Sequence, residues 1–150
     1  MTLTEIVQIL SGFVGSIGFA ILFNIRGKRL VVTGIGGFAS WFIFVILSWY
    51  IPSEAIIYFI VACGISIYAE VMARVVKAPT TTFIISSLIP LVPGSSLYYT
   101  MANAFEGNLK AFLQRGVYTV ELSAALALGI IVTTAVAKII YSKVNKYKKA

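Results

Sequence analysis

The residues best suited to chemistry form two groups, and the first is a polar stripe. Ser66, Glu70 and Arg74, followed by Lys77, recur at steps of four, four and three, so they share one helix face. Glu70 and Arg74 have the spacing of a helical ion pair. Such a pair inside a membrane should face protein or water, because a charge facing lipid is costly. The alternative is an interfacial anchor, in which Arg74 and Lys77 reach toward lipid phosphates.

The second group lies in residues 78–105, which contain no charged residue. Pro90 and Pro93 fall inside this run, and each lacks the N–H that a continuous helix needs. Hydrocarbon cannot satisfy the freed carbonyls, so this segment must be covered by protein or line a wet cavity. We predict a broken span whose break lies near the middle of the bilayer, an arrangement with which many secondary transporters bind cargo.

Hydroxyl side chains surround the predicted break. They could bind a small polar solute, or they could satisfy the backbone of the broken helix. If a second half-helix begins near Gly94, its first amides offer a site for a carboxylate. The hydroxyl residues are Thr80, Thr81, Thr82, Ser86, Ser87, Ser95, Ser96, Tyr98, Tyr99 and Thr100.

Glu121 is a further candidate, one turn inside the last apolar stretch, with Tyr118 just before it. A carboxylate that enters a low dielectric tends to hold a proton, which suits a proton-coupled transporter. Equally, Glu121 could lie at the headgroup level and be solvated.

The chain lacks the residue types that several classes of chemistry require. The chain has no histidine, no aspartate and a single cysteine, Cys63, so the usual metal sets, histidine-based triads and internal disulfides are excluded. No nucleotide-binding loop is present either. We therefore expect neither a cofactor nor enzymatic activity, and energy coupling must come from an ion gradient or another subunit.

The composition is that of a membrane protein. Of the 150 residues, 59% are hydrophobic and 11% are charged, against roughly 25% charged in a soluble domain. We predict one all-α transmembrane domain covering residues 1–150, with a retained first span. Its five helices cover about 5–24, 30–50, 54–73, 80–101 and 117–141, the fourth broken at Pro90, Pro93 and Gly94. An amphipathic stretch over 102–116 should lie along the outer surface, or else be a tucked gating segment.

Charge predicts the orientation. Ten of the twelve basic residues fall in the loops after the first and third spans and in the C-terminal tail. Basic loops stay cytoplasmic, so the N-terminus should be outside and the C-terminus cytoplasmic. The basic residues flank apolar spans, which favours lipid headgroups over nucleic acid as their partner. The tail lysines are Lys138, Lys143, Lys146, Lys148 and Lys149, and Tyr141 and Tyr147 should mark the inner interface.

Small residues predict helix contacts. The pairs Ser11 and Gly15, Gly12 and Ser16, and Ala125 and Gly129 have the spacing that lets helix backbones approach closely in lipid.

Three segments resemble one known family. They are residues 18–24, which end at Asn24, residues 69–74 leading to Ala78 and Pro79, and residues 89–94 followed by Tyr98 and Met101. Together they resemble the threonine/serine exporter family. The resemblance is to the small unit of that family, which consists only of membrane spans, and it covers nearly the whole chain.

The resemblance implies a subunit of a secondary exporter in the bacterial cytoplasmic membrane. Its implied partners are a larger membrane subunit of the same family, the lipid bilayer, an amino acid or small carboxylate as cargo, and further copies of the chain. Two alternatives stay open, which are export of dicarboxylates such as succinate and a structural subunit that only stabilises a partner. The residues expected along the substrate pathway are Asn24, Glu70, Arg74, Ser86, Pro90, Pro93, Gly94, Ser96, Tyr98 and Glu121.

Overall fold

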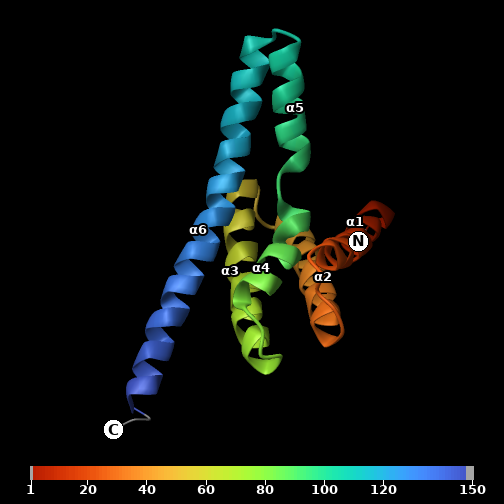
Figure 1. Cartoon of the computed structure of the whole chain (residues 1–150). Helices are drawn as coiled ribbons and strands as arrows, with labels where there is room; N and C mark the ends of the chain where they lie inside the picture. The colour runs from red at the N-terminus through yellow and green to blue at the C-terminus, as the bar shows by residue number, and fades with distance from the viewer. Residues whose placement is uncertain (1, 148–150) are drawn as a thin grey trace.

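The chain is built from helices that follow one another through short turns (Figure 1). The computed structural model describes the backbone of residues 2–147 and the side chains of residues 2–142, and this part contains no strand. The predicted all-α fold is therefore confirmed. The elements are α1 (Leu3–Leu22), α2 (Lys28–Ser48), α3 (Glu54–Val75), α4 (Thr80–Leu88), the 3-10 turn η1 (Ile89–Leu91), α5 (Gly94–Phe105) and α6 (Leu109–Tyr147).

The predicted break is present. Four helices, α1, α2, α3 and α6, are long and apolar enough to cross a membrane, and α4 with η1 joins α5 in a fifth candidate bent by 58°. Pro90 lies in η1, and Pro93 precedes the first residue of α5. The amide of Val92 donates to the carbonyl of Ile89 at 3.0 Å, so one of the carbonyls freed by the prolines is satisfied locally.

The short helix α4 occupies the centre of the bundle. It packs against α1, α2 and α3, while α6 runs beside α3 on one side (Figure 1). Phe83 of α4 and Leu91 of η1 are fully buried, in one core with residues of α3. The first half of the broken segment is thus largely covered by protein, as freed backbone groups in lipid require, whereas Val92 in the link and Gly94 at the start of α5 are exposed.

The break lies near the start of α3. Pro93 shares a cavity with Glu54 and Tyr58, which belong to the first two turns of α3. The 12 residues of α4 and η1 rise about 18 Å as helix, and the extended link through Val92 adds to that length before α5 begins. The break nevertheless falls midway along its own segment, since Thr80–Leu91 and Gly94–Phe105 contain 12 residues each. Its place near the middle of the bilayer stays a prediction.

The last helix is longer than predicted. Two contacts join it to the two ends of α3, because the Tyr118 hydroxyl donates to Glu54 at the start of α3 and Arg74 near the end of α3 stacks on Tyr141. The part of α6 between these contacts runs beside α3, and the predicted span 117–141 stays a prediction. At 39 residues, α6 is about 58 Å long, so it also extends well beyond α3 toward its own N-terminus.

The predicted surface helix over 102–116 is wrong. Residues up to Phe105 belong to α5, a turn follows at Gly107 (φ 72°), and α6 begins at Leu109. The side chain of Asn108 accepts from the amide of Ala111 and caps α6. Helix then continues through Gly116, because one glycine costs only about 1 kcal/mol. The segments α5 and α6 form a hairpin that projects from the bundle (Figure 1).

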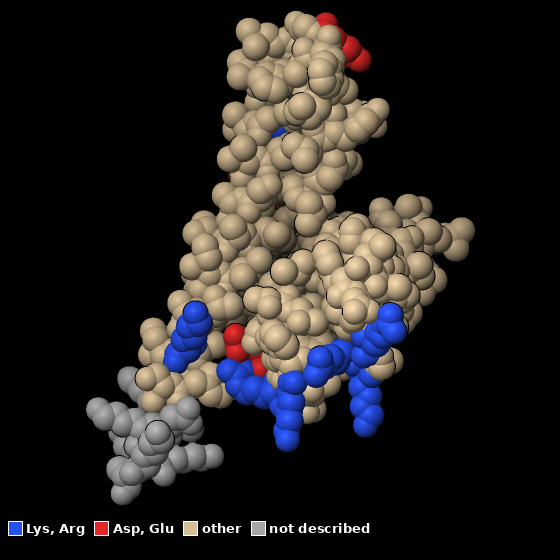
Figure 2. All heavy atoms as spheres, viewed as in Figure 1, with Lys and Arg blue, Asp and Glu red and all other residues tan. Residues whose placement is uncertain are grey.

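Basic residues gather at one end of the bundle, as the loop charges predict (Figure 2). We call this the basic end. There Arg29 donates to the carbonyl of Lys77 at 3.3 Å and ties the first loop to the third. At the opposite end, Trp49 donates to Glu5 at 3.0 Å. The side chains of Lys143, Lys146, Tyr147, Lys148 and Lys149 lie outside the described residues.

Glycines set how closely the helices approach. A Cβ on Gly12 would overlap Trp41, one on Gly37 would overlap Ser16, and one on Gly36 would overlap Ser87 of α4. The predicted pair of Gly12 and Ser16 is therefore confirmed as a contact between α1 and α2.

The other two small-residue pairs differ in outcome. A Cβ on Gly129 would come within 2.6 Å of the Ala62 Cβ, and Ala125 packs against the core, so this pair does lie between α6 and α3. Around Gly15 a Cβ would meet nothing within 4 Å, so the prediction for Ser11 and Gly15 is wrong.

We expect Gly36→Ala to lower the free energy of unfolding by about 1–3 kcal/mol, because the added methyl overpacks the contact with Ser87. The matched control Gly15→Ala should raise it by up to about 1 kcal/mol, since the site is open and alanine favours helix. Thermal unfolding in detergent measures both. Equal effects of the two substitutions would contradict the assigned contact.

Candidate functional site

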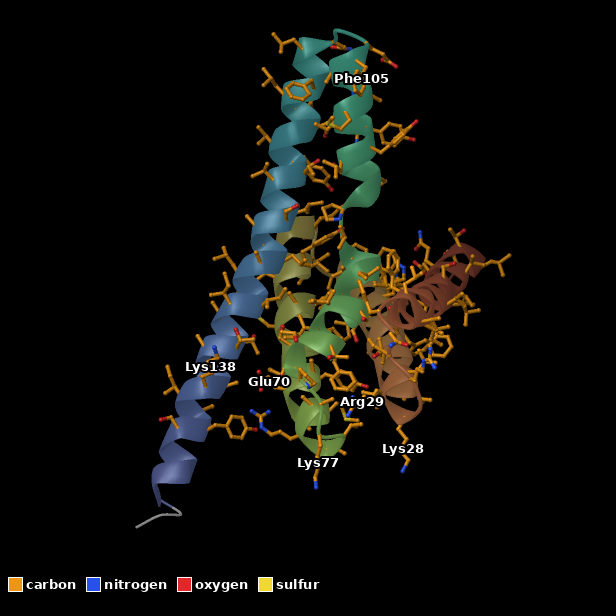
Figure 3. All side chains as sticks on the ribbon, in the orientation of Figure 1. Lys28, Arg29, Glu70, Lys77, Phe105 and Lys138 are labelled. Atoms are coloured by element: carbon orange, nitrogen blue, oxygen red, sulfur yellow. The ribbon has the colours of Figure 1, made fainter. Side chains whose placement is uncertain are left out.

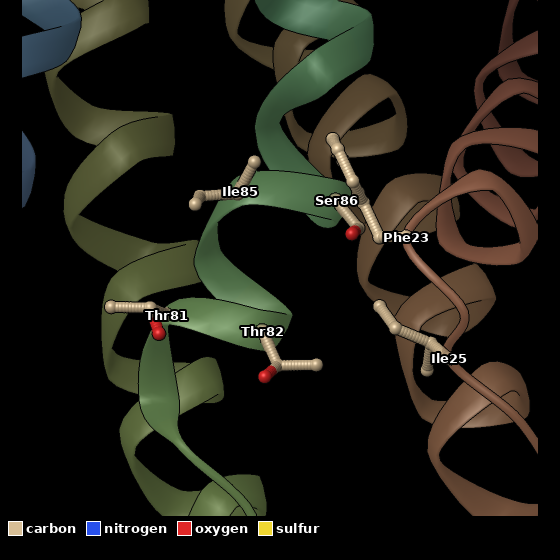
Figure 4. Close-up of a pocket in the computed structure, with 6 residues that line it drawn as sticks. All are labelled: Phe23, Ile25, Thr81, Thr82, Ile85 and Ser86. Atoms are coloured by element: carbon tan, nitrogen blue, oxygen red, sulfur yellow. The ribbon is translucent and has the colours of Figure 1, made fainter.

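Two cavities lie on either side of the break. The first, which we call the Ser86 cavity, has a volume of about 230 Å³ and opens between the start of α4 and the turn after α1 (Figure 4). Ser86 is fully buried, and within the described residues its Oγ has no hydrogen-bond partner. Figure 4 shows this hydroxyl pointing toward Phe23. The residues that line the cavity are Phe23, Ile25, Thr81, Thr82, Ile85 and Ser86.

The turn after α1 places two walls of the Ser86 cavity. Asn24 has φ 58°, in the left-handed region that asparagine tolerates better than most residues. This conformation ends α1, and the amide of Ile25 donates back to the carbonyl of Ala20 at 2.8 Å. Asn24 itself is exposed, so its part in the cavity is to direct its two neighbours, Phe23 and Ile25.

The second cavity, which we call the Arg115 cavity, has a volume of about 260 Å³ and lies where α5 begins. No side chain caps α5 at Pro93. The first amides of a helix have no partner within it and carry partial positive charge, so Ser95 and Ser96 offer free donors at this wall. The residues that line the cavity are Glu54, Tyr58, Pro93, Ser95, Ser96, Tyr99, Arg115, Tyr118 and Leu122.

Charges of opposite sign share the Arg115 cavity. Arg115 comes from α6, and its guanidinium carbon lies 5.8 Å from the centre of the Tyr99 ring. Glu54 comes from α3 and accepts a hydrogen bond from the Tyr118 hydroxyl. The cavity can therefore bind a group of either charge, or one molecule that carries both.

A cluster of hydroxyls fixes the wall of the Arg115 cavity. Ser96 and Thr119 lie 2.7 Å apart between their hydroxyl oxygens, and Thr100 and Thr119 lie 3.2 Å apart. All three side chains are buried between α5 and α6. The hydroxyls of Ser96 and Thr100 are thus satisfied by hydrogen bonds within the protein. The hydroxyl of Ser86 has no such partner among the described residues.

Glu70 and Arg74 lie elsewhere. They form the predicted ion pair, with 2.8 Å between Arg74 Nη2 and Glu70 Oε2. Glu70 lines a groove between α3 and α6 that shares no residue with either cavity. A role of the pair in the inner substrate path stays a prediction.

The remaining predicted residues are placed as follows. Tyr98 is 68% exposed and packs edge to face on Tyr99. Glu121 is exposed and makes no ion pair among the described side chains. Pro90 and Gly94 shape the backbone of the break, and Pro93 and Ser96 line the Arg115 cavity.

Glu54 and Arg115 are site residues that the sequence alone did not predict. A signal was available for Arg115, because it and Lys110 are the two basic residues predicted on the side opposite the basic loops. An isolated charge at that end needs a partner or a ligand.

A comparison with protein families decides the identity. The family model described as "Threonine/Serine exporter, ThrE" matches residues 8–136, which include the linings of both cavities. The chain belongs to the threonine/serine exporter family. Members of this family are transporters, and together with the long apolar helices the match makes the chain a multi-pass membrane transport protein. No curated protein and no solved structure matches the chain.

For this exporter-family chain we expect Ser86→Ala to leave the free energy of unfolding unchanged or to raise it, because the substitution removes an unpaired buried hydroxyl. Ser40→Ala is the matched control, since Ser40 is equally buried but donates to the carbonyl of Gly37 at 2.8 Å. The control should lose about 1 kcal/mol. Thermal unfolding in detergent compares them, and a larger loss at Ser86 would show that its hydroxyl is bonded in the protein alone.

Proposed function

We propose that the chain is the membrane subunit of a secondary exporter of small amino acids, of the threonine and serine type, and that it works with a larger subunit of the same family. Its cargo binds in the Arg115 cavity, against the break. The observation that carries this proposal is that Arg115 and Glu54 line one cavity together with the uncapped start of α5.

The charges of the Arg115 cavity fit a free amino acid. Such a molecule carries a carboxylate and an ammonium group a short distance apart. Arg115 and the first amides of α5 suit the carboxylate, and Glu54 suits the ammonium group. The volume of about 260 Å³ is below the roughly 300–1,000 Å³ of pockets for drug-sized ligands, which favours small cargo.

Export of dicarboxylates is less well supported. A second carboxylate on the cargo would meet Glu54, and like charges repel strongly in a site with little water. A purely structural subunit is also less well supported, because it gives no reason for two opposite charges in one cavity beside the break.

The two cavities suggest a path through the chain. The Ser86 cavity opens near the basic end, and the Arg115 cavity opens near the start of α3. Leu91, which lies in the chain between the linings of the two cavities, is fully buried in the core. With the basic end in the cytoplasm of a bacterial cell, cargo would enter at Ser86 and leave at Arg115. In alternating access, one group of helices moves against another, so that the cargo site opens first to one side of the membrane and then to the other.

We expect Arg115→Gln to raise the KM for threonine counterflow at least about tenfold, because the substitution removes a charged hydrogen bond to the cargo carboxylate. The measurement uses vesicles that contain this chain and the larger subunit. Lys110→Gln is the matched control, since Lys110 is a basic residue of α6 close by that does not line the cavity. Equal KM values for the two variants would remove Arg115 from the site.

Substitution of Glu54 tests whether its charge selects the cargo. We expect Glu54→Gln to weaken threonine counterflow and to reduce the discrimination against succinate, since the repulsion of a second carboxylate is lost. If the larger subunit alone transports at the full rate, the chain is a structural subunit and the proposal fails.

The break itself is tested by removing its prolines. We expect the double variant Pro90→Ala, Pro93→Ala to lose most transport, because a continuous helix would take up the free amides of α5. Circular dichroism and thermal unfolding check that the variant is folded. A folded variant that transports at the wild-type rate would show that the break does not bind cargo.

A further inference from the structure

A long apolar groove runs between α3 and α6 at the basic end, away from both cavities. Its volume is about 370 Å³, and nearly all of its wall is aliphatic, including Ile67 and Val71 of α3 and Val132, Val136 and Ile140 of α6. Figure 3 shows α3 and α6 side by side at this level. An aliphatic wall on the outside of a spanning helix pair suits a hydrocarbon chain.

The groove ends in polar groups toward the basic end. Glu70 and Tyr141 belong to its lining, and the Arg74 guanidinium carbon lies 3.4 Å from the centre of the Tyr141 ring. Lys138 lies three residues before Tyr141, so both project from one side of α6, and Figure 3 shows Lys138 at the level of Glu70.

The charge at this end of the groove favours an anion. Arg74 and Lys138 are positive, and Glu70 is the one acid among the residues that line the groove. Lys77 adds a further positive charge just beyond α3, which ends at Val75. Its backbone is left-handed (φ 51°), so the prediction that Lys77 shares the helix face of Glu70 and Arg74 is wrong. A guanidinium has five donors in a planar fork, and the Glu70 carboxylate and carbonyl leave some of the Arg74 donors free.

We propose that the α3–α6 groove binds an acyl chain of an anionic phospholipid, with the lipid phosphate held by Arg74 and Lys138. Glu70 and Tyr141 are the positioning residues, because they hold the Arg74 guanidinium at the end of the groove. Basic clusters at this level of a membrane attract anionic headgroups. The assignment is independent of the cargo site, since the groove shares no residue with the Ser86 or Arg115 cavity.

The test measures lipid binding to the full chain in detergent by native mass spectrometry. Phosphatidylglycerol and phosphatidylcholine with identical acyl chains separate the effect of charge, and glycerol 3-phosphate separates the headgroup from the chain. We expect phosphatidylglycerol to bind at least about fivefold more tightly than phosphatidylcholine, and glycerol 3-phosphate to compete weakly.

Two pairs of variants locate the site. Arg74→Gln should lower the affinity for phosphatidylglycerol about fivefold, which corresponds to about 1 kcal/mol per basic residue at a membrane surface, whereas the control Lys28→Gln at the same end should change it little. Ala137→Phe should fill the groove and abolish retention of the lipid, whereas Ala135→Phe, outside the lining, should not. If Arg74→Gln is unfolded, Lys138→Gln replaces it with the same expectation.

Three results would overturn the proposal. One is equal affinity for the two lipids, and another is full retention of phosphatidylglycerol by Ala137→Phe. The third is release of the lipid when the larger subunit is added, which would assign the groove to a protein helix.

Discussion

The structure depends on how a backbone broken by two prolines is kept away from hydrocarbon. Pro90 and Pro93 remove donors that a continuous helix would use. The 3-10 turn recovers one bond, from the Val92 amide to the Ile89 carbonyl. The packing of α4 among α1, α2 and α3 buries Leu88 and Leu91 on either side of Pro90, whereas Val92 stays exposed. Since lipid offers no donors or acceptors, the other helices must surround the break.

Close packing of small residues makes that enclosure feasible. Gly37 meets Ser16 between α2 and α1, and Gly36 meets Ser87 between α2 and α4. Without these short approaches α4 would be held farther from α2, and the buried hydroxyls of the break would lie in a looser site. Gly36 therefore links helix association to the shape of the Ser86 cavity, which is lined by the residue that precedes Ser87 in α4.

The polar groups divide between two ends with different chemistry. Near the basic end, the Ser86 cavity presents hydroxyls and aliphatic walls, with no ionised side chain in its lining. Near the start of α3, the Arg115 cavity presents both charges and the start of a helix. On the path we propose, a cargo would meet stronger electrostatic contacts at the Arg115 cavity than at the Ser86 cavity, and its release would need a driving force.

Local spacing in the sequence was sufficient for much of this protein. The apolar stretches, the prolines and the loop charges predicted the spans, the break and the basic end, because each depends on neighbouring residues. The ion pair of Glu70 and Arg74 followed from one turn of helix. Tertiary structure alone decided that Glu54 and Arg115, far apart in the chain, share a cavity and that Glu70 faces a different groove. Which side chains share a cavity depends on how each helix is rotated and how high it lies relative to its neighbours. Contacts between helices, such as Gly36 with Ser87, set these two quantities. The periodicity of a single helix cannot reveal them.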